Sequence, residues 1–230
     1  MRRAYVPFFN AGELMNDLFF SSDIWMLILG GLQTTIVIFV FAAILAILLG
    51  AGLSYLNISK RWPWLYNPLE WFVSTVHEIP AIAFMMFFYY VVFVGEMNGI
   101  VVSIIALGIY ASDSLEDVFN VHIRQVDKGQ VEAGLALGLT KRQCYQHIVL
   151  PQAVKSMLPL LAGELRALLQ ATSYAGYIAQ HDLMKVVDTI REQYNDTLLP
   201  LIIVSILYLI LAWIITTLVK SLYAKLFRYD

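Results

Sequence analysis

Residues 129–159 read GQVEAGLALGLTKRQCYQHIVLPQAVKSMLP, a polar and turn-punctuated stretch between strongly apolar segments. Glu, Ala and Leu favour helix, so we predict a first helix over residues 131–137, with Gly138 at its left-handed C-terminal cap. Thr140 suits the N-cap of a second helix that runs through Ile148. Leu150-Pro151 is expected to end that helix and start the next, because proline lacks a backbone N–H but is tolerated in a first turn. The stretch therefore predicts a helix–turn–helix elbow at one side of a membrane.

The elbow also carries a pattern of seven positions at fixed spacing: Glu132-Ala133-Gly134, then Gly138 after three residues, Ile148 after nine more, and Leu150-Pro151 after one more. This pattern resembles the cytoplasmic EAA loop of bacterial ABC-transporter permeases, with Gly134 in place of an alanine. Gly129-Gln130 and Pro151-Gln152-Ala153 look like the polar amino acid importer subfamily. The resemblance implies that residues 129–155 form a coupling loop, whose helix docks in a cleft of a separate ATPase subunit.

The composition points to an integral membrane protein. Of the 230 residues, 60% are hydrophobic and only 14% are charged, and the mean hydropathy is +0.70. A soluble domain of this size could not bury so much apolar surface. The one cysteine, Cys144, excludes an internal disulfide. The first apolar run is too long for a signal peptide, and the net charge of −2 gives no indication of nucleic-acid binding.

The apolar segments predict an all-α membrane protein with five spans, at about 25–56, 69–94, 99–119, 156–177 and 197–219. The first exceeds the ~20 residues needed to cross a bilayer, so we expect it to tilt or project. Residues 1–23 mix charged and aromatic side chains and are interpreted as an interfacial segment preceding a permease domain over 24–230. Residues 181–196 are expected to form a polar loop. The sequence shows no internal repeat, so the usual signature of an inverted-repeat secondary transporter is missing.

Lysine and arginine are distributed unevenly over the predicted loops. Ten lie on the side of the elbow and the C-terminal tail, and four lie on the side of the N-terminus. Because positive charge marks the cytoplasmic side, we expect the elbow and the C-terminus inside and the N-terminus in the periplasm. This agrees with the bacterial inner-membrane location that the resemblance implies.

Two ionisable residues, Glu164 and Arg166, lie inside the fourth predicted span, where an unpaired charge is costly. They are two residues apart and so point in different directions on a helix. They either make structural hydrogen bonds to other helices or face a polar cavity. In the resembling family an Asn-Glu pair and a Lys-Asp-Thr-Ser run follow the elbow, where this sequence has Gly163-Glu164 and Gln170-Ala171-Thr172-Ser173. The Glu and the Thr-Ser pair match, whereas the Asn, Lys and Asp do not. The resemblance implies that Glu164 lines the substrate pocket and faces an ammonium group. Thr172 and Ser173 line the cavity or bond helix backbones.

His77-Glu78-Ile79-Pro80 stands where the family usually reads Arg-Gly-Thr-Pro. Because a proline frees a backbone carbonyl and bends a helix, His77 and Glu78 are predicted to line the path, or else to be solvated at a membrane edge. A second histidine at the spacing that binds zinc is missing, so we assign no metal site. Asp117 falls where the family has a glutamate and joins the predicted pathway. Glu116 is interpreted as part of a solvated helix end.

The resemblance implies the type I ABC importer permease fold and a permease subunit of an ATP-driven importer. Its substrate would be an amino acid or a related small zwitterion, such as an opine or a modified amino acid. The expected partners are a second permease chain (itself or a sister), two ATPase subunits that hold ATP and Mg, a periplasmic substrate-binding protein and membrane lipid. The sequence has no Walker phosphate loop, so we expect no cofactor and no enzymatic activity in this chain.

Two other function classes stay open. An ion- or proton-coupled secondary transporter could use Glu78, Asp117 and Glu164 as a relay. A membrane-embedded enzyme could use His77 and Glu78, but it would need a third convergent polar group that the sequence does not reveal.

Overall fold

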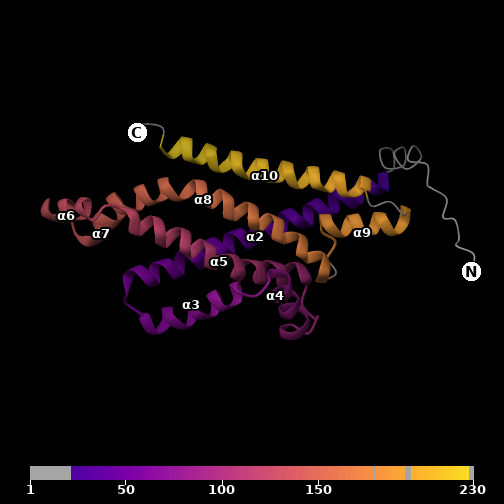
Figure 1. The fold of residues 1–230 in the computed structure, drawn as a ribbon, viewed down its shortest axis with the longest axis horizontal. Helices are drawn as coiled ribbons and strands as arrows, with labels where there is room; N and C mark the ends of the chain where they lie inside the picture. Colours follow the sequence, from indigo (N-terminus) through magenta and orange to yellow (C-terminus); the bar gives the residue numbers. More distant parts are fainter. Residues whose placement is uncertain (1–21, 179, 195–197, 228–230) are drawn as a thin grey trace, which may run out of the picture.

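The computed structural model describes residues 22–178, 180–194 and 198–227, and the described part is helical without strands. Long helices run side by side along one axis, with the elbow at one end and a short helix, α9, at the other (Figure 1). The predicted interfacial segment, residues 1–23, lies outside the described residues except for its last two, which begin the first helix.

Four helices of the described part are long and apolar enough to cross a membrane. They are α2 (Ser22–Ser59), α5 (Gly99–Gln125), the run Lys141–Ile178 and α10 (Leu198–Leu226). Each extends beyond the predicted apolar span at one end or both, because backbone hydrogen bonds continue a helix through polar residues that hydropathy excludes.

The predicted span 69–94 is not one straight helix. It starts earlier, at α3 (Pro63–His77), and continues as α4 (Ala81–Phe87) and the π-helical η1 (Phe88–Val92). The two parts are bent by 111° at the break. Pro80, with φ of −52° and ψ of 128°, is extended and has no N–H to carry the helix on. With the bent pair counted as one span, the described chain has the predicted five.

The break predicted at Leu150-Pro151 is wrong. α7 (Lys141–Cys144), the π-helical η2 (Tyr145–Val149), α8 (Leu150–Ala171) and the 3₁₀-helical η3 (Thr172–Ile178) follow one another without a turn. The Leu150 N–H donates to the Tyr145 carbonyl five residues before it. This wider turn directly precedes Pro151, and it relieves the clash that a proline ring makes with the carbonyl four residues earlier.

The polar loop predicted over 181–196 is also wrong, because α9 (Leu183–Tyr194) occupies most of it. Asp182 caps this helix, with Oδ1 accepting from the Lys185 N–H at 2.9 Å. The buried side chains recur at helical spacing: Leu183, Val186, Val187 and Ile190. They pack against α2 and α10, so the segment is an amphipathic helix rather than a loop.

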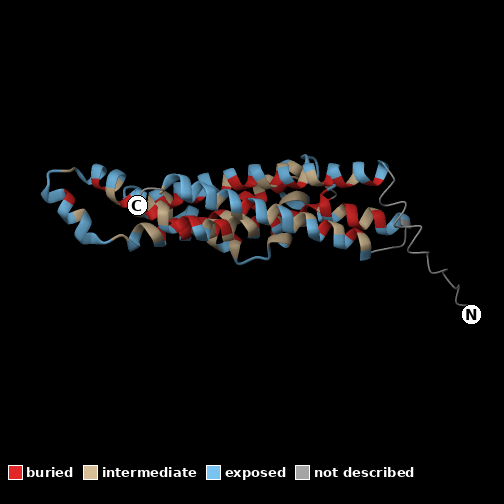
Figure 2. Cartoon of the chain, turned by 90° about the horizontal axis from the view of Figure 1, so that it is seen from above, coloured by how far each residue is buried: buried red, intermediate tan, exposed pale blue. Residues whose placement is uncertain are grey.

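The core lies where α2 crosses α5. A Cβ on Gly50 of α2 would come within 2.9 Å of the Ser112 carbonyl of α5, so only glycine permits this approach. Buried side chains from the bent pair and from α8, including Phe84, Met85 and Leu168, complete the cluster. Buried residues follow the inner faces, whereas the outer faces and most of the elbow are exposed (Figure 2). This is the pattern expected of a helix bundle in lipid.

Candidate functional site: the elbow and the polar residues of the spans

The elbow has the local geometry predicted from its sequence. Gly138, just after α6 (Lys128–Ala136), has a left-handed φ of +88°. Thr140 and Gln143 form a reciprocal capping box at the start of α7. The Thr140 hydroxyl accepts from the Gln143 N–H at 3.3 Å, and Gln143 Oε1 accepts from the Thr140 N–H at 2.8 Å. Both caps fix the angle between the two helices.

Gly134 explains how α6 lies so close to the following helix. It is buried, and a Cβ there would come within 2.8 Å of Ile148 Cδ1 and 3.0 Å of Cys144 Sγ. Cys144 itself is fully buried. The glycine that replaces the alanine of the EAA pattern therefore allows α6 to lie in close contact with the following helix inside the elbow.

The outer face of the elbow is exposed. Glu132, Ala133, Leu150 and Pro151 all lie on the surface. Leu137, at the tip, is 85% exposed. Leu135, on the same side of the turn, is 39% exposed as well, so the tip presents two apolar side chains to the surface. Nothing in the residue pattern singled out Leu137, because its exposure depends on the turn at Gly138.

Glu116 is not at a solvated helix end, as the sequence suggested, but is only 4% exposed. Its Oε1 accepts from Tyr66 Oη at 3.0 Å, from Asn120 Nδ2 at 3.0 Å and from Asn57 Nδ2 at 3.4 Å. These donors come from α3, α5 and α2, so one carboxylate joins three helices. This arrangement satisfies a buried charge that would otherwise be costly.

The same network continues toward the elbow. Ser54 donates to Asn120 Oδ1 at 2.8 Å, and the Arg124 guanidinium donates to Asn57 Oδ1 at 2.9 Å. Glu116, Asn120 and Arg124 are spaced four residues apart and share one face of α5. That spacing is the signal in the sequence that could have revealed the network.

Arg166 and Glu164 do not pair. The Arg166 guanidinium donates from Nη1 to Thr216 Oγ1 on α10 at 3.0 Å. It lines a mostly apolar cavity of about 320 Å³ between α8 and α10. Glu164 is half-buried, and in the described part of the chain its carboxylate makes no hydrogen bond or ion pair. The structure thus leaves Glu164 available to a ligand or a second subunit.

His77 packs onto α5, with its ring 4.6 Å from the Tyr110 ring and Nδ1 3.1 Å from the Tyr110 carbonyl. Glu78 and Asp117 are exposed. These three residues lie close enough to Asp113 to act on its charge, as does Glu70. The bent pair and α5 therefore place three carboxylates and one histidine within electrostatic range of Asp113, a residue to which the sequence assigned no role.

Thr172 and Ser173 donate to carbonyls three residues back in their own helix, at 2.7 Å each. They bond the helix backbone, the commoner of the two predicted roles. Ser173 also lines a cavity of about 340 Å³ between α4, η3 and α9. Lys185 and Asp188 contribute a cation and an anion to its wall.

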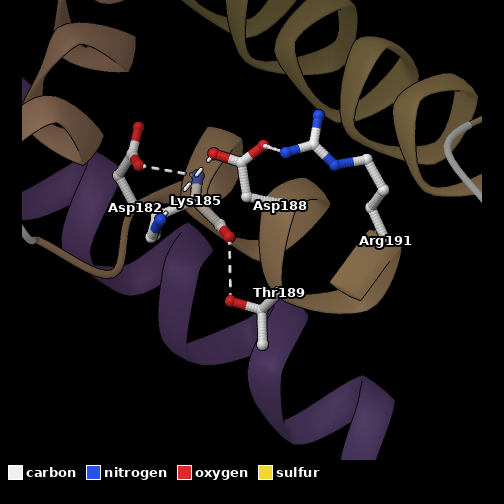
Figure 3. Close-up of polar contacts among 5 residues, drawn as sticks. All are labelled: Asp182, Lys185, Asp188, Thr189 and Arg191. Carbon is white, nitrogen blue, oxygen red and sulfur yellow. Dashed lines mark hydrogen bonds and ion pairs between the residues drawn. The ribbon is translucent and has the colours of Figure 1, made fainter. Parts of the chain in front are cut away.

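Figure 3 shows the polar face of α9 around Lys185 and Asp188. Asp188 pairs with Arg191 at 3.1 Å and with Lys185 at 3.8 Å, and Thr189 donates to the Lys185 carbonyl at 3.0 Å. Asp182 is fully buried, and its Oδ2 has no hydrogen-bond partner in the described residues. Burial raises the pKa of Asp182 to about 6.

The sequence matches the profile of the binding-protein-dependent transport system inner membrane components over residues 42–228. It is 28% identical over 210 residues to a probable amino-acid ABC transporter permease of Sinorhizobium fredii, with 89% of each chain covered. It is also 28% identical over 206 residues to the arginine transport system permease ArtQ of Bacillus subtilis, covering 88% of this chain and 94% of ArtQ.

The fold resembles two kinds of solved transporter. One is an amino acid ABC transporter crystallised with histidines, at a TM-score of 0.78 and 22% identity over 91% of this chain and 98% of that chain. The other is the inward-facing MetNI methionine ABC transporter, at a TM-score of 0.75 and 18% identity. That match covers 90% of this chain and 99% of the MetNI chain. The five-span helical architecture is that of type I ABC importer permeases. The chain belongs to the family of binding-protein-dependent transport system inner membrane components, the permease subunits of ABC transporters.

Proposed function

We propose that this chain is the permease subunit of an ATP-driven importer of amino acids, and that the elbow couples ATPase movement to the substrate path. One observation carries the proposal: the elbow's second helix and the span that holds Glu164 and Arg166 form one continuous helix, Lys141–Ile178. At 1.5 Å per residue this rod is about 57 Å long. A displacement at its elbow end is transmitted to both charged residues.

The substrate class follows from the charges in the spans. Glu164 and the carboxylates around Asp113 favour a cationic amine, and Arg166 favours a carboxylate. The spans therefore carry groups for both charges of a zwitterion, with Arg166 now bonded to Thr216. The names of two relatives, an arginine permease and a glutamate/aspartate import permease of Escherichia coli, agree with an amino acid as substrate.

The expected assembly has two permease chains, because one bundle of five spans does not enclose a path. Two cytoplasmic ATPases would hold ATP and Mg and receive the exposed tip at Leu137. A periplasmic binding protein would deliver substrate at the α9 end. The uneven distribution of lysine and arginine supports an inner-membrane orientation with the elbow and C-terminus inside and the N-terminus in the periplasm.

The test is reconstitution of the co-purified complex in proteoliposomes, with uptake of labelled amino acids measured with and without internal ATP. We expect uptake to need ATP and a loaded binding protein. Glu164→Gln should lower substrate-stimulated ATPase activity without loss of assembly, whereas Glu96→Gln, in an exposed turn, should not. Uptake driven by a proton gradient without ATP would instead support the secondary-transporter alternative.

A further inference from the structure

A third cavity, of about 550 Å³, lies where the ends of α2 and α5 meet the elbow. Its lining includes three cations, Lys60, Arg124 and Lys128, and no acidic residue. Arg124 and Lys128 are four residues apart at the junction of α5 and α6, and the fold brings Lys60, at the end of α2, to the same cavity. The cavity is therefore a basic pocket at one end of the spans.

The rest of the wall is largely apolar, with Ile58, Ile123, Val126, Val131 and Val149 facing the cavity. A pocket for a small, fully hydrated anion would be expected to have polar walls. A basic rim over branched aliphatic side chains instead matches a ligand that is anionic at one end and apolar at the other.

The turn after α2 places this cavity at the level of the lipid headgroups. Trp62 and Trp64 are exposed there, 39% and 73% respectively. The Arg61 guanidinium lies 5.0 Å from the centre of the Trp62 ring. Exposed tryptophan beside arginine is typical of the membrane–water interface.

One of the cations, Arg124, is held in place by a hydrogen bond. Arg124 donates to Asn57 Oδ1 at 2.9 Å and is thereby tied to the buried network of Glu116. Lys60 has a φ of +49°, a left-handed conformation that lysine rarely adopts. Asparagine tolerates this conformation better than lysine, so a Lys60→Asn substitution removes the charge without adding strain to the turn.

We propose that this cavity binds the headgroup phosphate of an anionic phospholipid from the cytoplasmic leaflet, with the start of an acyl chain against the aliphatic wall. Basic pockets between spans on the cytoplasmic side are suited to such headgroups. The bound lipid would lie between the end of α5 and the elbow, so the lipid composition of the membrane would affect coupling. The inference rests on the orientation given under Proposed function.

The test uses the full-length permease, purified without ATPase or substrate, and native mass spectrometry in the presence of phosphatidylglycerol or phosphatidylcholine. The parent protein should retain phosphatidylglycerol preferentially. The variant Lys60→Asn/Lys128→Gln should bind it about 30-fold more weakly, because each cation near an anionic headgroup contributes about a factor of five. The matched control, Lys141→Gln/Arg142→Gln, removes two exposed charges of the elbow that do not line the cavity.

Each outcome decides the proposal. Loss of phosphatidylglycerol from the lining variant but not from the control supports it. Equal binding in all three proteins, or equal loss from both variants, overturns it in favour of general surface charge. Displacement of the lipid by inorganic phosphate would reassign the pocket to a free anion. Because no transport is measured, failure here leaves the importer proposal unaffected.

Discussion

Gly138 shows how one backbone angle governs the elbow. Its φ of +88° is a conformation that other residues reach only at a cost, although a Cβ there would meet no atom within 4 Å. Gly138→Val should therefore cost about 1–2 kcal/mol through conformation alone and lower substrate-stimulated ATPase activity of the assembled transporter. Gly138→Asn, which tolerates left-handed φ, should stay close to the parent activity. Equal loss in both variants would point to a contact rather than a backbone effect.

Asp182 should make stability depend on pH. Its pKa of about 6 lies above the ordinary 3.8, because burial disfavours the charged form. The native state keeps a proton that the unfolded chain has lost, so stability should fall as pH rises from about 4 to about 6 and then level off. The total loss is on the order of 3 kcal/mol.

Asp182→Asn removes this ionisation and keeps an equally good N-cap. We expect thermal unfolding of the purified permease to depend less on pH in this variant than in the parent. Glu192→Gln, an exposed acid on the same helix, is the control and should keep the parent's slope. The assignment would be wrong if both variants had the same slope.

The elbow helices depend on the contact between Gly134 and Ile148. Gly134→Ala should have a small effect, because the Ile148 Cδ1 atom that a Cβ approaches to 2.8 Å is the end of a flexible side chain. Gly134→Val should cost about 1–3 kcal/mol by overpacking. Ile148→Val removes that Cδ1 atom and should restore part of the loss in both melting temperature and ATPase stimulation. Additive effects of the two substitutions would rule out the contact.

The contact between the ends of α2, α3 and α5 depends on the hydrogen bonds of Glu116. Glu116→Ala leaves the buried Asn120 amide and the part-buried Tyr66 hydroxyl without their acceptor, which should cost about 3 kcal/mol. The adjacent exposed residue gives the comparison, and Asp117→Ala should change stability by no more than about 0.5 kcal/mol. Melting temperatures of the permease in one detergent would decide this. Equal shifts of the melting temperature in the two variants would contradict a core role for Glu116.

These elements show which parts of the structure the sequence could predict. The caps at Gly138 and Thr140 follow from interactions within three residues, so local rules are sufficient. The continuation through Pro151 depends on a π turn, which no propensity indicates. α9 was missed because its many polar residues concealed apolar side chains at helical spacing. Glu116 was misplaced because its burial depends on partners more than 45 residues away.

For the whole molecule, the apolar segments and the resemblance were sufficient to predict the fold. The contacts of the predicted pathway residues could not be predicted, because they depend on neighbouring helices that one sequence cannot place. Arg166 faces α10 and His77 faces α5. The roles predicted for the coupling and pathway residues, which include Glu132, Ala133, Glu78 and Asp117, stay predictions. Packing between helices distant in sequence, rather than local pattern, decides which polar side chains are satisfied.

The orientation of the whole chain can be tested with Cys144 replaced by alanine and single cysteines introduced into the permease expressed alone. Cys144 is buried, so its replacement leaves the surface unchanged. Glu96→Cys should react with a membrane-impermeant maleimide in spheroplasts, because its turn is expected outside. Leu137→Cys should react only in inside-out vesicles. The reverse pattern would place the elbow in the periplasm.

The 111° bend between α3 and α4 has a consequence for how the chain enters the membrane during synthesis. α3 has 15 residues, and α4 and η1 have seven and five, so neither arm reaches the ~20 residues of an independent span. Buried Val76, Phe84 and Met85 share a cluster with Ala106 and Leu107 of α5, which the ribosome makes later. The bent arms can bury these residues only after α5 has emerged. The bent pair therefore completes its packing only after α5 has been made.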